Sequence, residues 1–181
     1  MLGAHGMGGG AAAPPQPKTD SHSIYDITSL IEDAKSEIQN ATSDSVLSSI
    51  LKGQGGYKVT SDCDAQLLFN LYFSTPVKIH HLKIRGCSLG TSPLNIKLFI
   101  NRAPLSFDDV EAIDPTEELE IQEGELEGDL ILSYVKYQNV SNLTIFVEDN
   151  REGGDVTEMS QLEFFGAPLH ETNMSELKKV G

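Results

Sequence analysis

Four carboxylates at a turn near residue 150 are the first side chains in this sequence whose types and spacing could do chemistry. They lie in the stretch LTIFVEDNREGGDVTEMSQLEFFG, residues 143–166, and are Glu148, Asp149, Asp155 and Glu158. Carboxylate oxygens are the ligands that Ca²⁺ prefers in proteins. Their spacing does not follow the D-x-[DN]-x-[DN]-G-x₅-E register, which excludes an EF-hand loop. We therefore expect no bound metal at this turn, and we assign Glu158 to the start of the following strand.

The cysteines and the paired histidines lack the spacing of a redox site or a metal site. Cys63 and Cys87 lie 24 positions apart, which fits neither a C-x-x-C motif nor half of a familiar zinc site. We expect both to be free thiols that are buried or half-buried. His80 and His81 are adjacent, and adjacent side chains of a regular strand face opposite sides, so the pair should not hold one metal ion together.

Sequence motifs of catalysis are likewise missing. The chain contains no G-x-S-x-G, H-E-x-x-H or G-x-x-x-x-G-K-[ST] pattern. A carboxylate pair of the glycosidase type depends on distance in space, and 27 acidic residues will bring some carboxylates together in any fold. We therefore predict a non-enzymatic protein with no catalytic residue and no cofactor.

The charge of the chain limits its partners. The formal net charge is −14, which argues against binding to nucleic acid or to an anionic membrane, because both require Lys and Arg. Residues 108–129 hold 11 acidic side chains and no Lys or Arg. This segment is either a solvated loop that keeps the protein soluble and shields a sheet edge, or a surface that steers a basic partner. Leu119, Ile121 and Leu126 interrupt the acids and indicate partial packing.

The ends of the chain and its hydropathy suggest where the protein works. Residues 1–22 are rich in Gly, Ala and Pro and predict a disordered tail. They lack the apolar run of a secretory signal, and the sequence holds no stretch of the roughly 20 apolar residues that span a bilayer. We expect a cytoplasmic protein, with the nucleus as a second compartment. A monomer is favoured because like charge opposes self-association.

The apolar pattern predicts helix first and strand afterwards. Residues 24–41 repeat apolar side chains at helical spacing, and Ser29 and Glu32 could form a capping box, so we expect one amphipathic helix there. A second short helical pattern, SVLSSIL at residues 45–51, ends at glycines.

From residue 57 the period changes to two. Alternating segments at 67–73, 77–84, 94–100, 130–137, 143–148 and 161–165 predict six strands, with shorter edge strands near 57–60 and 118–121. Six to eight strands without intervening helices cannot form parallel βαβ units. The sequence therefore predicts an all-β fold, an antiparallel β-sandwich of jelly-roll type with a short N-terminal helix, as a single domain over residues 23–181.

The turn near residue 150 then joins two strands that share one core. Asp149, Asn150 and Arg151 would stand at its tip, exposed and free of packing, where a loop on a rigid scaffold can contact a partner. We predict protein-partner contacts at these three residues and at the start of the acidic segment, Asp108 and Asp109.

Four stretches, taken in order, resemble a known family. They are SDCDAQLLFNLYFSTPVKIHHLKIRG, KLFINRAPLSFDDVEAIDPTEELEI, YVKYQNVSNLTIFVEDN and LEFFGAP. Together they are similar to the PITH domain, found at the C-terminus of thioredoxin-like proteins, over roughly residues 24–181. The resemblance implies a jelly-roll sandwich similar to galactose-binding-like domains, and docking on the regulatory particle of the 26S proteasome. The thioredoxin domain and its C-x-x-C do not occur in this chain, so no redox activity is implied.

Two functions follow as expectations, and a hydrolase ranks third behind them. The first is a protein-interaction module that binds proteasome regulatory-particle subunits. The second is a carbohydrate- or small-ligand-binding domain, because galactose-binding-like folds present loops for such ligands; this rests on fold analogy alone. The chain has no Trp, and its aromatic residues fall mostly inside the expected strands, so it offers few of the platforms that sugar sites use.

Overall fold

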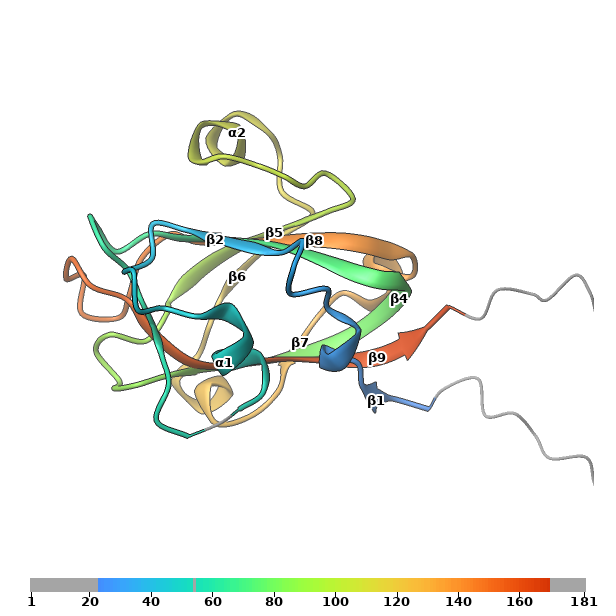
Figure 1. Ribbon diagram of the computed structural model, residues 1–181, viewed down its shortest axis with the longest axis horizontal. Helices are drawn as coiled ribbons and strands as arrows, with labels where there is room; N and C mark the ends of the chain where they lie inside the picture. Colours follow the sequence, from blue (N-terminus) through green and yellow to red (C-terminus); the bar gives the residue numbers. More distant parts are fainter. Residues whose placement is uncertain (1–22, 54, 170–181) are drawn as a thin grey trace, which may run out of the picture.

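The computed structural model describes residues 23–53 and 55–169 (Figure 1). The predicted tail at residues 1–22 lies outside the described residues. The strands are β1 (Tyr25–Asp26), β2 (Glu37–Gln39), β3 (Val59–Thr60), β4 (Leu67–Gly86), β5 (Asn95–Ile100), β6 (Glu117–Glu120), β7 (Leu130–Ile131), β8 (Val140–Val147) and β9 (Glu158–Pro168). The helices are α1 (Leu47–Leu51) and α2 (Phe107–Ala112), with short 3₁₀ turns η1 (Thr28–Leu30), η2 (Glu123–Leu126) and η3 (Tyr134–Tyr137).

Strand β4 runs through both layers of a sandwich. Its first half pairs with β2 and β8, and its second half pairs with β7 and β9. The β4–β8 register shifts between Tyr72 and Val77, where the strand passes from one layer to the other. Figure 1 shows β2, β5 and β8 in the upper layer and β7 and β9 in the lower one. All of these strand pairs are antiparallel, which confirms the antiparallel β-sandwich of jelly-roll type.

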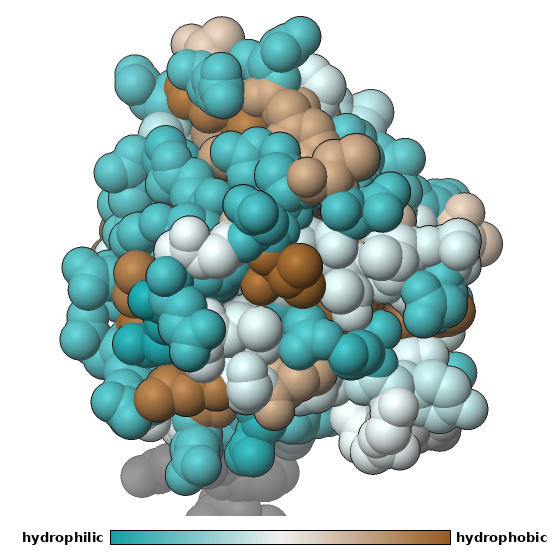
Figure 2. All heavy atoms as spheres, turned by 90° about the vertical axis from the view of Figure 1, so that its left-hand side faces the viewer, coloured by the Kyte–Doolittle hydropathy of each residue, from teal (hydrophilic) through white to brown (hydrophobic). Residues whose placement is uncertain are grey.

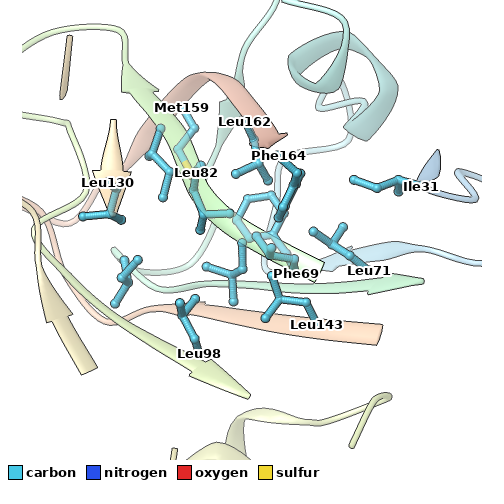
Figure 3. Close-up of a cluster of buried hydrophobic side chains, with 14 of the residues drawn as sticks. Ile31, Phe69, Leu71, Leu82, Leu98, Leu130, Leu143, Met159, Leu162 and Phe164 are labelled. Carbon is cyan, nitrogen blue, oxygen red and sulfur yellow. The ribbon is translucent and has the colours of Figure 1, made fainter. Parts of the chain in front are cut away.

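The main core fills the space between the two layers. Alternation places every second side chain of a strand on the inner face. Each fully buried Leu or Phe contributes about 1.5–3 kcal/mol of hydrophobic stabilisation, so this layer supplies much of the driving force for folding. Phe73 and Phe164 meet edge to face with ring centroids 5.8 Å apart. Figure 3 shows side chains of both layers meeting there, among them Phe69, Leu71, Leu82, Leu98, Leu143, Met159, Leu162 and Phe164.

A second, smaller cluster lies on the outer face of the upper layer. It consists of Leu68, Phe99 and Phe146 from the sheet, with Leu105 and Val110 packed on them. Helix α2 covers this face in Figure 1. Strand β4 is therefore buried on both sides in its first half, which explains why residues 67–71 read as a nearly continuous apolar run rather than a strict alternation.

Asn70 holds the segment that leads into α2. Its Oδ1 accepts hydrogen bonds from Thr144 Oγ1 at 2.7 Å and from Leu105 N at 3.1 Å. Its Nδ2 donates to Leu105 O at 2.9 Å and to Glu37 Oε1 at 3.0 Å. The side chain is fully buried, and these bonds compensate the desolvation of its amide. This amide therefore positions α2 relative to the sheet.

The helix predicted over residues 24–41 is wrong. The segment forms β1, η1 and β2, which lie along the edges of both layers. Ile27 and Ile31 are buried as the pattern required, but Ala34 is exposed and Leu30 is only half-buried. The side chains of Ile27 and Ile31 thus reach the core from either end of the turn η1. Beyond Ile31, the residues at helical spacing are not buried.

Hydrogen bonds to neighbouring strands decide this local structure. Ile27 N donates to Phe164 O at 2.9 Å, and Glu32 N donates to Tyr72 O at 2.8 Å. The carboxylate of Glu32, expected to cap a helix with Ser29, pairs instead with Lys35 at 2.5 Å. The second helical pattern, at residues 45–51, is confirmed as α1. None of the helices in the described part of the chain has the length and apolar character that crossing a membrane requires.

Two strand boundaries also differ from prediction. The sequence Ser-Thr-Pro at residues 74–76 was expected to separate two strands, but β4 continues through it. The segment predicted as a strand at 130–137 is a strand only at β7 and continues as η3. Leu130, Leu132 and Tyr137 are buried while Val135 is 86% exposed, a spacing that a strand cannot satisfy and a 3₁₀ turn can.

Candidate functional site

Asn150 is a structural residue of the turn. The expectation that it is exposed and free of packing is wrong, because only 3% of it is accessible. Its Nδ2 donates to Gly154 O and Val156 O, each at 2.9 Å, and its Oδ1 accepts from Gly154 N at 3.0 Å. The side chain thus closes the loop on itself, as an Asx-type turn does.

The residues on either side of Asn150 are held as well. The carboxylate of Asp149 accepts from Asn95 N and Asn95 Nδ2, each at 2.9 Å. The guanidinium of Arg151 donates to the backbone oxygen of Ile121. Both side chains are only half-exposed. The prediction that all three residues are exposed and free of packing is therefore wrong. Whether they contact a partner remains a prediction.

The other carboxylates of the turn are engaged separately. Glu148 accepts from Lys97 Nζ at 2.8 Å, and Glu158 pairs with Lys58. The Lys58 ammonium group holds the pKa of Glu158 below its ordinary value. Strand β9 begins at Glu158, as predicted. Within the described ranges, no three His, Cys, Asp or Glu side chains are grouped so that they could bind a metal ion.

Asp108 and Asp109 lie in the first turn of α2. Ser106 and Asp109 form a capping box: the Asp109 carboxylate accepts from Ser106 N at 2.8 Å, and Ser106 Oγ accepts from Asp109 N at 3.3 Å. These bonds to Ser106 lower the pKa of Asp109. Asp108 is exposed. Figure 1 shows α2 above the upper layer and the turn at residues 149–157 at the left-hand end, so the five predicted contact residues do not form one site.

The acidic segment is attached to the sheet. Ile121 and Leu126 are buried and Leu119 is half-buried, which confirms the partial packing predicted from the sequence. Strand β6 is the last strand of the sheet order, and Glu118 and Glu120, on either side of half-buried Leu119, are exposed. Charged side chains on an edge strand oppose pairing with another chain. This placement fits the interpretation of the segment as a charged sheet edge.

Both cysteines are exposed free thiols, so the expectation that they are buried or half-buried is wrong. Cys63 and Cys87 follow strands rather than occupying inward positions. Although Cys87 is exposed, desolvation by the protein atoms around its thiol raises the pKa of that thiol, with the Glu158 carboxylate acting in the same direction. The thiolate, which is the reactive form, is therefore disfavoured at Cys87.

His80 and His81 face the same side of the sheet, which corrects the prediction that they face opposite sides. The register of β4 against β9 shifts between Ile79 and His81, so His80 is the extra residue of a β-bulge. The sequence carried a signal for this bulge. The inward positions are odd-numbered before it and even-numbered after it, at Val77, Ile79, Leu82 and Ile84.

The bulge builds a compact cluster on the outer face of the lower layer. The Nδ1 atoms of His80 and His81 are 2.9 Å apart, so one ring donates to the other. The His81 ring stacks on Phe165 with centroids 4.6 Å apart, and the Lys83 ammonium lies 4.8 Å from the centre of the same Phe165 ring. Asp129 Oδ1 lies 3.6 Å from His81 Nε2.

Burial makes His81 a source of acid sensitivity. It lowers the pKa of His81, an effect that His80 and Lys83 increase and Asp129 opposes. The unfolded chain then binds a proton at His81 more readily than the folded chain does. The free energy of unfolding is therefore highest above the ordinary pKa of 6.5, and it falls as the pH drops through the lower pKa of His81 in the folded state. We expect His81→Gln to flatten the decline of Tm between about pH 7 and 5.

Thermal unfolding of the wild type and of His81→Gln across this range measures the slope. His80→Gln is the matched control and should retain most of it, because the ring of His81 stays between Phe165 and Asp129. Parallel Tm curves for wild type and His81→Gln would contradict the assignment.

A groove of about 430 Å³ lies beside the bulge. It is lined by residues of four segments: Ile24 before β1, Lys78 and His80 of β4, Tyr134 of η3, and Gly166 and Ala167 of β9. The ring centroids of His80 and Tyr134 are 6.2 Å apart. A larger hollow of about 550 Å³ elsewhere is lined by charges of both signs, among them Arg85, Glu123 and Glu127.

Large apolar side chains stand exposed in the groove, at Ile24 and Tyr134, and in the segment next to it, at Ile131 and Val135. Ile24 is 46% exposed, Tyr134 43% and Val135 86%. Ile131 is also exposed; it lies opposite His81 in the β4–β7 pairing, and the following residue, Leu132, donates from its N to His80 O at 3.1 Å. Exposed apolar side chains scattered singly are ordinary, but their gathering around one groove is typical of interaction surfaces. No sequence pattern marked this site, because its parts come from distant segments.

The loop end of the sandwich has a different character. Figure 2 faces this end and shows a mostly hydrophilic surface with a few separate apolar patches. The loops there are cross-linked: Thr157 Oγ1 donates to Ala65 O at 2.6 Å, and Arg151 N donates to Ser92 O at 3.1 Å. The groove beside the bulge is therefore the better candidate for an interaction site.

Solved structures define the class of this fold. The chain is similar to the family 32 carbohydrate-binding module of NanJ from Clostridium perfringens, solved with galactose, with a TM-score of 0.59 and 9% identity over 79% of this chain and 99% of that one. It is also similar to CBM32-3 of a family 31 glycoside hydrolase from the same organism, with a TM-score of 0.53 and 10% identity. At this identity the likeness shows the fold alone: a galactose-binding-like jelly-roll domain.

The sequence comparisons then place the chain in a family. A PITH domain profile matches residues 17–181, and the chain belongs to the PITH domain family. It is 35% identical to thioredoxin-like protein 1 of Schizosaccharomyces pombe over 83% of this chain and 54% of the relative. It is 31% identical to PITH domain-containing protein ZK353.9 of Caenorhabditis elegans over 93% of this chain and 84% of the relative. The chain thus spans about half the length of the first of these relatives.

Proposed function

We propose that this PITH domain is a non-enzymatic protein-interaction module that docks on the regulatory particle of the 26S proteasome. The family resemblance supplies the partner. The observation that carries an interaction role is a groove lined by the exposed side chains of Ile24 and Tyr134, with Ile131 and Val135 exposed in the segment that contributes Tyr134. Aromatic residues in such positions are common anchors of protein interfaces. The module would act as a monomer in the cytoplasm and nucleus, without nucleic acid or membrane.

Quantitative affinity purification tests this function. The tagged chain is incubated with cell extract at low and at moderate salt, and co-purified proteins are measured by mass spectrometry. We expect enrichment of regulatory-particle subunits with the wild type. Loss of these subunits is expected for the double variant Tyr134→Ala and Val135→Ala, which removes exposed apolar surface without touching the core.

The matched control removes exposed apolar side chains away from the groove. Val46 is 50% exposed and Tyr57 58% exposed, and neither lines the groove. The double variant Val46→Ala and Tyr57→Ala should therefore retain the subunits. Absence of regulatory-particle subunits from the wild-type sample at both salt concentrations would refute the proposal.

A further inference from the structure

The second half of β4 carries cationic side chains along its outer face. Residues 78–85 contain three Lys or Arg, two His and no acid, in a chain of net charge −14. Because Val77, Ile79, Leu82 and Ile84 are buried, the intervening side chains point outward. The bulge adds a second outward histidine to this row. The row consists of Lys78, His80, His81, Lys83 and Arg85, and we call it the cationic stripe after its two lysines and its arginine.

Among the described residues, the two ends of the cationic stripe make no ion pair within 4 Å, although Arg85 shares a hollow with Glu123 and Glu127. Lys83 lies 3.8 Å from Asp129 and opposite Glu163 in the β4–β9 pairing. Across the part of the chain that the structure describes, the ion pairs involve neither Lys78 nor Arg85. Cations without an internal partner, on a surface that is otherwise acidic, favour an anionic ligand by complementarity.

The groove lies at the Lys78 end of this stripe. Lys78 and His80 line it together with the apolar side chains of Ile24 and Tyr134. Gly166 also lines the groove, and a Cβ there would lie 1.8 Å from Lys78 O, so β9 approaches β4 closely at this point. The combination of an apolar recess and an adjacent ammonium group suits a bulky apolar side chain that is followed or preceded by a carboxylate.

We propose that the groove and the cationic stripe together dock an extended acidic segment of a partner protein, with an apolar side chain in the groove and carboxylates at Lys78 and Arg85. The proposal rests on the interaction role proposed above and specifies the chemistry of the partner. From Lys78 to Arg85 the strand rises by roughly 23 Å, the length of about seven extended residues. A polyanion that offers charge without an apolar anchor would leave the recess unused.

Fluorescence anisotropy with the full chain tests the site directly. The probe is a fluorescein-labelled peptide of alternating glutamate and leucine, about eight residues long. We expect saturable binding that weakens with added salt, and about tenfold weaker binding for Lys78→Glu, because charge reversal turns attraction into repulsion. Arg85→Glu and Tyr134→Ala should each weaken binding severalfold.

Matched controls separate the site from general charge. Lys52→Glu makes the same change at an exposed lysine outside the groove and the stripe, and it should leave affinity unchanged. Peptides with serine in place of leucine, or with lysine in place of glutamate, should bind at least about tenfold more weakly. Equal Tm values would show that the variants are folded.

Four results would overturn the proposal. They are unchanged affinity of Lys78→Glu, equal binding of the serine peptide, equal binding of an oligothymidylate of similar length, and a dimer in sedimentation that the labelled peptide does not dissociate. The last result would mean that a second copy covers the surface. Failure of the proteasome purification with peptide binding intact would reject the proteasome as partner and leave the site standing.

Discussion

Replacing Gly166 with alanine is expected to lower the free energy of unfolding by about 3–5 kcal/mol. Gly166 lies opposite Ile79 in the β4–β9 pairing, beside the bulge. A Cβ there would stand 1.8 Å from Lys78 O and 2.9 Å from Lys78 C, closer than atoms can approach. The obstacle is backbone, which cannot rotate away as a side chain could, so the two strands must separate at the point where both the core and the groove depend on their pairing.

Thermal and urea unfolding measure this effect. For a chain of this size the expected loss corresponds to a fall in Tm of roughly 10 °C. The matched control is Gly124→Ala, since a Cβ on Gly124 meets no atom within 4 Å. It should change stability by less than about 0.5 kcal/mol. A Gly166→Ala protein with the Tm of the wild type would show that β4 and β9 are not packed as described.

Replacing Asn150 with alanine is expected to cost about 2–4 kcal/mol. The change removes the donated bonds to Gly154 O and Val156 O, a longer one to Thr157 Oγ1 at 3.4 Å, and the accepted bond from Gly154 N. Each backbone group that loses its partner costs about 1–3 kcal/mol when buried, and the exposure of Gly154 and Val156 to water reduces that sum. Asn150→Asp should also destabilise, because it would place a carboxylate against two carbonyl oxygens.

The control for Asn150 lies in the same loop. Asp155 is exposed, and Asp155→Ala should change stability by less than about 0.5 kcal/mol. Measuring partner capture per folded molecule for both variants separates structure from recognition. A lower Tm with unchanged capture identifies Asn150 as a structural corner. Wild-type stability with reduced capture would restore the contact role predicted from the sequence.

The strands were predictable because alternation is a local property. Leu143, Ile145 and Val147 alternate, and β8 contains all three as buried residues. The same alternation located β5, β6 and β9 to within a few residues. It also contained the bulge at His80, because the inward positions change parity between Ile79 and Leu82. A shift of one residue in the apolar alternation of a strand indicates a β-bulge of this kind.

The helix at residues 24–41 could not be ruled out from its own residues. Ile27, Leu30 and Ile31 have helical spacing, and a turn that dips into a core gives the same short pattern. The choice depended on free backbone groups elsewhere, Phe164 O and Tyr72 O, which accept bonds from Ile27 and Glu32. Tertiary hydrogen bonding therefore overrode a local preference that is weak in magnitude.

The candidate site was even less accessible to sequence reasoning. The position of Asn150 in a turn predicts exposure, because turns usually lie at the surface, yet its amide is buried and makes hydrogen bonds within the loop. The groove joins Ile24, His80, Tyr134 and Gly166, which are far apart along the chain. No short stretch of the sequence contains more than one of the segments that line the groove.

The sequence by itself determined the all-β class, the positions of most strands, the acidic character and the membership of a family, because periodicity, charge and ordered motifs are written along the chain. Only the tertiary structure decided which side chains remain exposed. That decision depends on which strand edges and layers meet. Strand β4 shows the reason: its first half is buried on both faces by the core and by α2, while its second half leaves Lys78, His80 and Arg85 facing outward.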